Sequence, residues 1–300
     1  MNNIRFLRRS EIDLDKWDDT IAKATHSLPY AFSWYLDAVA EHWDALVMDD
    51  YKAVMPLVWT RKFGVKCLYQ PYYCQQLGVF SPRVLSADQQ KALLGMAAER
   101  FYYININLNP TAAEVEVDFK LKRKRNLLLD LHAEYKQLRK KYGGNHLRNI
   151  GKAGRAGVIS SEETSLKKFQ EFYLANLDRK KENFKRKHER ILKALTHALI
   201  ERKTAMIFTA LDSDKQILAA ALIIFHHNRI VNIINCSSDL GKKTGASHFL
   251  FDNIIRKYSS TSNILDFEGS SIPGVARFYE GFGAVEEVFY NYKKVPLKLS

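Results

Sequence analysis

The stretch from Asn263 to Ala284, NILDFEGSSIPGVARFYEGFGA, restricts the possible folds of this chain more than any other stretch. Its apolar start predicts a buried strand. The small residues that follow predict a turn and then a short helix that ends at Gly283. In α/β sheets, ligands usually bind at the carboxyl end of such a strand. The stretch therefore predicts a ligand site in a protein that mixes helices and strands.

A second strand–turn–helix pattern precedes this stretch, with the sequence RIVNIINCSSDLGKKTGASHFLFDNII. The first turn of a helix offers unpaired backbone N–H groups and the positive end of the helix dipole, and both suit a phosphate group. We therefore expect a donor-binding turn formed by Lys242, Lys243, Thr244, Gly245, Ala246 and Ser247. An ordinary helix start with solvated lysines would give the same pattern, because short glycine motifs are common.

Three side chains in the C-terminal stretch are candidates for chemistry. Tyr279, near the end of the predicted helix, can donate a proton to a leaving thiolate or alkoxide. Asp266 and Glu268 alternate along the predicted strand and would share one face, where Asp266 can accept a proton from an attacking amine. The alternatives are that Tyr279 only packs beside other aromatic residues and that Asp266 only caps a loop.

The length of 300 residues predicts about two domains of ~150 residues each. A helical segment over residues 132–157 is broken at Gly143 and Gly144 and predicts the connection between them. We therefore expect an N-terminal domain over 1–142 and a C-terminal domain, with the donor site, over 146–300. The fold class is α+β, because both halves alternate helices with meanders of strands.

The positive charge of the chain is concentrated in its middle. The net charge is +13, and residues 120–203 alone contain 24 Lys and Arg against 9 Asp and Glu. Such a basic region predicts a surface for an anionic partner, such as nucleic acid, a phosphorylated ligand or a membrane face. Solvated, lysine-rich helices are the alternative.

Composition also bears on location and cofactors. No run of ~18 apolar residues is present, so we expect no membrane span. The N-terminus lacks the apolar core of a signal peptide. Cys67, Cys74 and Cys236 are odd in number and have no metal-ligand spacing, which predicts a cytoplasmic protein with reduced thiols and no metal.

The two C-terminal patterns together resemble the acyl-CoA site of GNAT N-acyltransferases. Lys242, Gly245 and Ser247 stand where that family has Gln/Arg-x-x-Gly-x-Gly/Ala. The segment from Tyr279 to Gly283 matches its Tyr-x-x-x-Gly, in which the tyrosine often serves as general acid. The resemblance implies acyl-CoA as co-substrate.

A closer resemblance is to the Fem-type (FemAB-like) branch of this superfamily. It rests on LRNIGKAGRAGV (147–158), FQEFYLANLDRK (169–180) and the C-terminal stretch, with Glu268 in place of a glycine and Tyr279 in place of a lysine. The resemblance implies two tandem GNAT-like domains, each a mixed, mostly antiparallel sheet flanked by helices, with a substrate cleft between them. Classical Fem enzymes take an amino acid from aminoacyl-tRNA, which the basic region 120–203 would suit.

Further residues are expected to bind the acceptor substrate. Tyr173 and Arg179 match the Fem-type helix, and Arg179 can hold a carboxylate or phosphate with two hydrogen bonds. Tyr72 and Gln75 resemble the wall of a polar, aromatic pocket, and Glu268 is also expected to contact the acceptor. Each of these residues also fits ordinary surface or packing roles.

The sequence thus predicts an acyltransferase that moves an acetyl or similar group from acyl-CoA to an amine. One alternative is an aminoacyl-tRNA-dependent aminoacyltransferase that acts on a cell-wall or sugar-nucleotide precursor. Another is a catalytically inactive GNAT-like module that binds nucleic acid or an anionic polymer through residues 120–203. Binding of this last kind would fall steeply with salt.

Overall fold

The structure is a computed structural model, and it describes residues 3–114, 121–163, 165–177, 186–268 and 272–295. The chain divides into two compact units: unit 1 contains residues 1–125 and 288–300, and unit 2 contains residues 126–287. The expected domains, 1–142 and 146–300, remain a prediction, because a division by contacts does not show which parts fold on their own.

Unit 1 contains a mixed sheet with strand order β1-β2-β3-β4-β5-β12. Its elements are β1 (Ile4–Arg8), η1 (Arg9–Glu11), α1 (Leu14–Lys23), η2 (Pro29–Ala31), α2 (Ser33–Val39), β2 (Trp43–Met48), β3 (Ala53–Lys62), β4 (Val65–Tyr69), α3 (Ala87–Arg100), β5 (Tyr103–Leu108), η3 (Pro110–Glu114) and most of β12 (Val285–Lys294). β4 and β5 are parallel, with α3 between them in sequence, and the other neighbours in this order are antiparallel.

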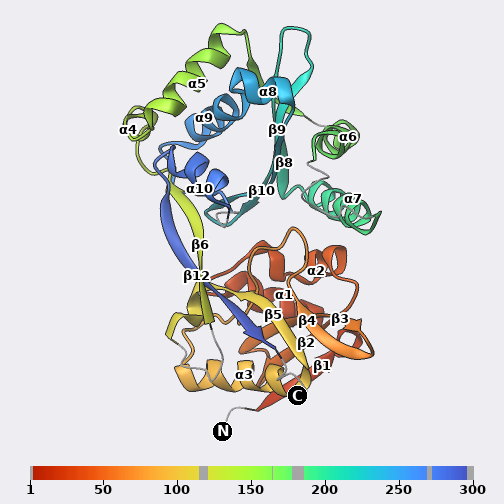
Figure 1. Ribbon diagram of the computed structural model, residues 1–300. Coiled ribbons are helices and arrows are strands. Elements are labelled where there is room, and N and C mark those ends of the chain that lie inside the picture. The colour runs from red at the N-terminus through yellow and green to blue at the C-terminus, as the bar shows by residue number, and fades with distance from the viewer. Residues whose placement is uncertain (1–2, 115–120, 164, 178–185, 269–271, 296–300) are drawn as a thin grey trace. The chain divides into compact units, whose positions relative to one another are not determined.

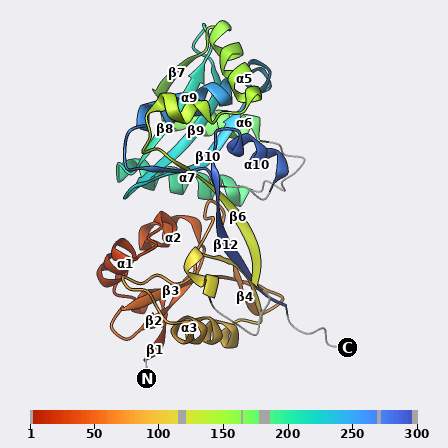
Figure 2. The ribbon, with the colours of Figure 1, turned by 90° about the vertical axis from the view of Figure 1, so that its left-hand side faces the viewer.

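Helices cover both faces of the unit 1 sheet, which explains why β2 is buried along its whole length. Figure 2 shows α1 and α3 on opposite sides of the unit 1 strands, and Leu46 and Met48 belong to the apolar cluster that includes Leu93 and other residues of α3. On the alternate face, the ring centroids of Trp43 and Trp17 of α1 lie 5.2 Å apart. Side chains alternate along a strand, so a strand with both faces covered has no polar side.

Local sequence signals set the helix starts in unit 1. The Ser86 hydroxyl accepts a hydrogen bond from the backbone N–H of Gln89, and Gln89 Oε1 accepts one from the backbone N–H of Ser86, which forms a capping box at the start of α3. Asp13 likewise accepts from the N–H of Lys16 and begins α1.

In unit 2, the strands of the same 12-stranded sheet follow in the order β6-β11-β10-β9-β8-β7. Its elements are the end of β6 (Leu121–Asp130), α4 (Tyr135–Lys140), α5 (Gly144–Arg155), β7 (Ile159–Glu163), α6 (Leu166–Asn176), α7 (Arg186–Glu201), β8 (Ala205–Leu211), β9 (Ile217–His226), β10 (Arg229–Ser237), α8 (Asp239–Thr244), α9 (Ala246–Tyr258), β11 (Ile264–Asp266) and α10 (Pro273–Glu280). Only β10 and β11 are parallel among these neighbours.

Helices also cover both faces of the unit 2 sheet. In Figure 1, α9 and α5 lie on one side of β8, β9 and β10, and α6 and α7 lie on the other. Leu250, Phe251 and Ile254 of α9 are buried in one core with Phe208 and Ile223. A mostly antiparallel sheet flanked by helices is thus present, as the sequence predicts, and its division into two tandem domains stays a prediction.

Candidate active site

The parallel strands β10 and β11 pair over only three residues and then separate. The register joins Arg229 to Ile264 and ends where Val231 meets Asp266. The Asn232 amide then spans the gap, because its Nδ2 donates to the Phe267 carbonyl at 3.2 Å. We call the region around Asn232 and Phe267 the fork. It lies at the carboxyl end of β11, where ligands usually bind in such sheets.

Two asparagines of β10 hold the hydroxyl group of Tyr279 at the fork. Asn232 Nδ2 donates to it at 3.1 Å and Asn235 Nδ2 at 2.7 Å. In a regular strand, residues three apart point to opposite faces. The register of β10 against β9 shifts between Asn232 and Ile234, and this bulge allows both amides to reach the same oxygen.

The environment of Tyr279 suits a proton donor. The side chain is only 3% exposed, and its ring stacks on Phe267 with centroids 4.5 Å apart. A hydroxyl oxygen accepts two hydrogen bonds and donates one, so the two asparagines leave the O–H of Tyr279 to donate elsewhere. Burial raises the pKa of Tyr279, although both asparagines act in the opposite direction. The phenol therefore stays protonated at neutral pH.

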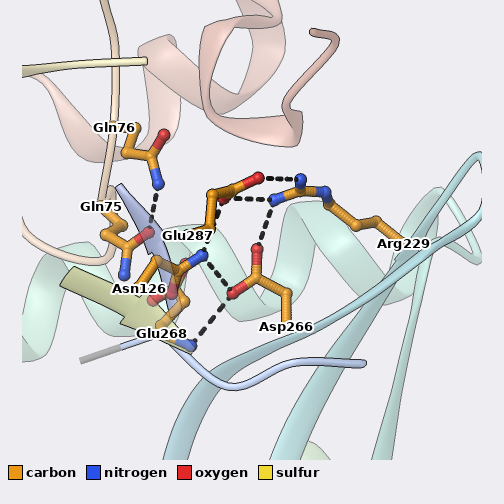
Figure 3. Close-up of polar contacts among 7 residues, drawn as sticks. All are labelled: Gln75, Gln76, Asn126, Arg229, Asp266, Glu268 and Glu287. Atoms are coloured by element: carbon orange, nitrogen blue, oxygen red, sulfur yellow. Dashed lines mark hydrogen bonds and ion pairs between the residues drawn. The ribbon is translucent and has the colours of Figure 1, made fainter. Parts of the chain in front are cut away.

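A network of charged groups extends along the β10–β11 pair, from Arg229, where the pairing begins, to Asp266, where it ends. Figure 3 shows the Arg229 guanidinium between two carboxylates: it pairs with Asp266 at 2.7 Å and with Glu287 at 2.8 Å. Asn126 Nδ2 donates to Asp266 Oδ1 at 2.9 Å and to Glu287 Oε2 at 3.2 Å. Burial opposes the charged form, but the two carboxylates raise the pKa of Arg229, so it stays charged.

This network changes the roles expected for the acidic residues. Asp266 is fully buried, and its carboxylate also accepts from the backbone N–H of Glu268 at 3.1 Å. It is therefore occupied as a structural anchor, which does not favour the predicted role as base. Burial raises the pKa of Asp266, against the effect of Arg229, and raises that of Glu268 well above its usual value.

The expectation that Asp266 and Glu268 share a strand face is wrong. β11 ends at Asp266, and Glu268 has a φ of 53°, in the left-handed region. A residue in that conformation ends the pleat, so the alternation of side chains stops there. The charge on Glu268 would raise the pKa of Tyr279, so a neutral Glu268 favours a lower Tyr279 pKa.

The predicted donor-binding turn is mostly helical. Lys242, Lys243 and Thr244 form the last turn of α8, so the prediction of a loop there is wrong. Ser238 caps α8 by accepting from the N–H of Gly241 at 3.0 Å. Lys242 pairs with Asp239 at 3.0 Å, and Lys243 is exposed.

The start of α9, which contains the rest of the predicted turn, is covered. Gly245 has a φ of 82° and joins α8 to α9, and Ala246 is buried, while Ser247 is partly exposed. A Cβ added at Gly245 would lie 2.7 Å from the carbonyl oxygen of Asn149 in α5. Helix α5 therefore packs closely against this helix start at Gly245.

Helix α5 also supports α10, which carries Tyr279. His146 Nε2 lies 2.6 Å from the Phe278 carbonyl, so this nitrogen is the donor. A Cβ added at Gly281 would lie 1.9 Å from His146 Cε1, so only glycine fits there. The ring of His248 lies 4.7 Å from that of His146, and burial, then His146, lowers the pKa of His248 to about 4. These two neutral rings pack against α10 and hold the helix that carries Tyr279 in place.

The basic excess of residues 120–203 is distributed unequally among the helices of unit 2. In α5, Arg148, Lys152 and Arg155 are exposed and lie on the face opposite the buried Ile150 and its neighbours. In the residues that the structure describes, none of these three has an ion-pair partner. We call them the α5 stripe. By contrast, several lysines of α6 and α7 are paired with glutamates.

The other predicted site residues belong to different parts of the chain. Tyr173 is buried in the core, with its ring stacked on Phe169. Arg179 lies outside the described residues. Tyr72 and Gln75 belong to unit 1, where Tyr72 is exposed and Gln75 Oε1 accepts from Gln76 Nε2 at 2.6 Å (Figure 3).

The described residues also contain no group of three His, Cys, Asp or Glu side chains that could hold a metal ion. Within the same ranges, none of the helices has the length and apolar character needed to cross a membrane.

Comparisons with known proteins identify the fold. No family model and no curated protein matches this sequence. The structure is similar to that of FemX, with a TM-score of 0.66 and 12% identity over 97% of each chain. It is also similar to the C-terminal domain of a putative lysylphosphatidylglycerol synthetase from Agrobacterium fabrum, with a TM-score of 0.58 and 12% identity over 95% of this chain and 92% of that one. The L-PGS structure from Bacillus licheniformis has a TM-score of 0.56 and 13% identity over 86% and 85% of the two chains.

At these low identities, the similarity defines the fold and not the substrates. The chain shares its fold with FemX, with the putative lysylphosphatidylglycerol synthetase domain and with L-PGS, in agreement with the Fem-type resemblance of its C-terminal motifs.

Proposed function

We propose that this chain transfers an acyl group from an activated ester to an amine, and that the reaction takes place at the fork. The observation that carries this proposal is the Tyr279 hydroxyl, which two asparagine amides hold at the point where β10 and β11 separate. A protonated phenol with its lone pairs occupied is arranged to donate its proton.

The reaction would proceed by attack of a neutral amine on the acyl carbonyl carbon. A C–N bond forms, and the oxyanion accepts hydrogen bonds from backbone N–H groups of β10 beyond Val231, where the register with β11 has ended. The C–O bond to the leaving group then breaks, and Tyr279 protonates the leaving oxygen. The surplus proton on the new amide nitrogen goes to solvent, and the tyrosinate recovers a proton.

The geometry favours an aminoacyl ester, as in aminoacyl-tRNA, over a thioester as donor. The pKa of Tyr279 is raised, so its proton suits an alkoxide better than a thiolate, since thiols have a pKa near ~8.5. The start of α9 is covered by Asn149. The α5 stripe offers unpaired cations to an RNA backbone. As acceptor we propose the amine of a cell-wall or sugar-nucleotide precursor, in the cytoplasm.

Acyl-CoA is the second candidate donor. The exposed Lys243 and the partly paired Lys242 lie at the end of α8, next to the start of α9, and would attract a pyrophosphate. With this donor the reaction would also take place at the fork, and Tyr279 would again be the proton donor. The two differ in the leaving group and in where the donor's phosphates bind.

The arrangement of strands supports the further proposal of two tandem GNAT-like domains. In unit 1, β4 is followed by α3 and the parallel strand β5. In unit 2, β10 is followed by α8, α9 and the parallel strand β11. The same strand–helix–parallel strand order thus occurs once in each unit.

A donor assay tests the proposal. The purified protein would be incubated with mixed aminoacyl-tRNA or with acetyl-CoA and a panel of amines that includes amino sugars and peptidoglycan precursors. Mass spectrometry would detect the new amide. We expect amide formation with aminoacyl-tRNA. Product from acetyl-CoA alone would make the second candidate correct, and no product from either donor, with salt-sensitive tRNA binding, would favour the inactive binding module.

A further inference from the structure

Unit 1 contains a cavity of about 190 Å³ that the proposed acyl transfer does not use. Its walls come from the loop after α1, the segment between β4 and α3, the second turn of α3, and η3. Val79, Phe80 and Leu85 form apolar walls, and Ser81, Arg83 and Gln90 are among the polar ones. A water molecule occupies about 30 Å³ of liquid, so the cavity has room for about six waters or one small organic molecule.

The walls of this cavity are fixed by hydrogen bonds within unit 1. Phe80 and Val54 exchange backbone bonds at 2.8 and 2.9 Å. The hydroxyl of Ser81 donates to the Lys52 carbonyl at 3.0 Å, and Asn109 Nδ2 donates to the Val79 carbonyl at 2.8 Å. The cavity is therefore formed before a ligand arrives, which reduces the entropy lost on binding.

Gln90 contributes an amide to this wall. The residue is 6% exposed and lines the cavity. Its amide atoms are not among the fully buried polar atoms of the described residues that lack a partner, so the amide is open to the cavity. An amide that lines a cavity offers donors and an acceptor to a ligand.

Arg83 gives the cavity its charge. Arg83 lines the cavity, and its side chain is also exposed to solvent. No carboxylate among the described residues pairs with it. A guanidinium holds a carboxylate with two parallel hydrogen bonds. An inorganic anion would not fill the space between the apolar walls. The ligand must therefore also carry a short hydrocarbon or aromatic body.

We propose that the cavity binds a small organic carboxylate. Its carboxylate would pair with Arg83 and accept a hydrogen bond from the Gln90 amide, while Val79, Phe80 and Leu85 cover its apolar body. The site lies within unit 1 and does not depend on the fork in unit 2.

Ligand-detected NMR and calorimetric titration of the full-length protein would test this. The probes are benzoate and isovalerate, with benzamide as the uncharged match of benzoate and phenyl phosphate as a different anion. We expect saturable binding of at least one carboxylate with a dissociation constant of about 1 mM or lower. Benzamide should bind at least about tenfold more weakly than benzoate, because it cannot form the ion pair.

Two variants locate the site. Gln90→Leu and Arg83→Gln should each weaken carboxylate binding at least about tenfold, and Arg61→Gln, at the β3–β4 hairpin, should leave it unchanged. The melting temperature of Gln90→Leu is measured alongside, and a value close to that of the unaltered chain shows that a loss of binding does not reflect unfolding. Absence of saturable binding, equal binding of benzamide, tighter binding of phenyl phosphate, or unchanged binding in both variants would overturn the proposal.

Discussion

The charged network and the fork differ sharply although Asp266 of the network directly precedes Phe267 of the fork. In the network, Arg229 carries a positive charge between the carboxylates of Asp266 and Glu287. At the fork, Tyr279 is held by uncharged amides. Both regions are largely buried, so burial alone does not distinguish them.

The difference lies in how fully the polar groups are paired. The Asp266 carboxylate receives bonds from Arg229, Asn126 and the N–H of Glu268. At the fork, the Asn232 side chain is 2% exposed and its Oδ1 has no hydrogen-bond partner in the described part of the chain. A fully paired network stabilises the strands, whereas spare hydrogen-bonding capacity is available to a substrate.

Removing the positive charge of Arg229 from the charged network should have the largest effect on stability. Arg229→Leu leaves Asp266 and Glu287 buried without their cation, and we expect a loss of about 3–5 kcal/mol in the free energy of unfolding. Urea denaturation measures this loss. Arg155→Leu, on the exposed face of α5, should stay within about 0.5 kcal/mol. Equal effects of the two variants would contradict the structural role of the network.

Low pH should destabilise the packing of His248 and His146 next to α10. The pKa of His248 is lowered to about 4 by burial and then by His146, whereas an unfolded histidine titrates near ~6.5. The neutral ring therefore contributes stability above pH ~6.5, and this stability is lost as the pH falls toward about 4.

The variant His248→Phe tests this contribution in unfolding experiments between pH 7 and 4. It should reduce the slope of the free energy of unfolding against pH by up to about 1.4 kcal/mol per pH unit. His226, whose pKa is also lowered to about 4 by burial and then by His227, lies at the far end of β9 and serves as control. His226→Phe should reduce the slope without affecting activity, and an unchanged slope in His248→Phe would show that the ring is not held neutral.

Much of the local structure was predictable because its signals are local. The cap of α3, with Ser86 and Gln89, and the separate helices on either side of Gly143 depend on residues close in sequence. Helix α8 was missed because six residues carry little periodicity and Gly241 weakens the helix signal, although Ser238 is a suitable cap.

The candidate site was only partly predictable. Tyr279 was found from its motif, but Asn232 and Asn235 were not considered. In a regular strand they would point to opposite faces, and the sequence gives no sign of the bulge that brings them together. The Arg229 network joins residues between 37 and 161 positions apart, and pairing at such distances leaves no local pattern.

Neutralising the α5 stripe should have the smallest effect on stability. The triple variant Arg148→Gln, Lys152→Gln and Arg155→Gln should remain within about 0.5 kcal/mol per substitution, because all three side chains are exposed. Binding of tRNA should lose about 2–3 units of its slope against the logarithm of salt concentration. Fluorescence anisotropy at several salt concentrations measures that slope.

The matched control removes three exposed lysines of unit 2 from outside α5: Lys167→Gln, Lys193→Gln and Lys203→Gln. Lys167 and Lys193 already pair with glutamates, so this variant should change the slope less. A larger change in the control would assign RNA binding to the face of α6 and α7 instead.

The most direct test of the central claim is turnover of Tyr279→Phe with the active donor and acceptor. Removing only the hydroxyl leaves the stacking on Phe267 intact, so stability should change by about 1 kcal/mol. We predict a fall in kcat of about 10²–10⁴-fold with little change in donor affinity. Turnover equal to that of the unaltered chain would contradict the assignment of Tyr279 as the acid.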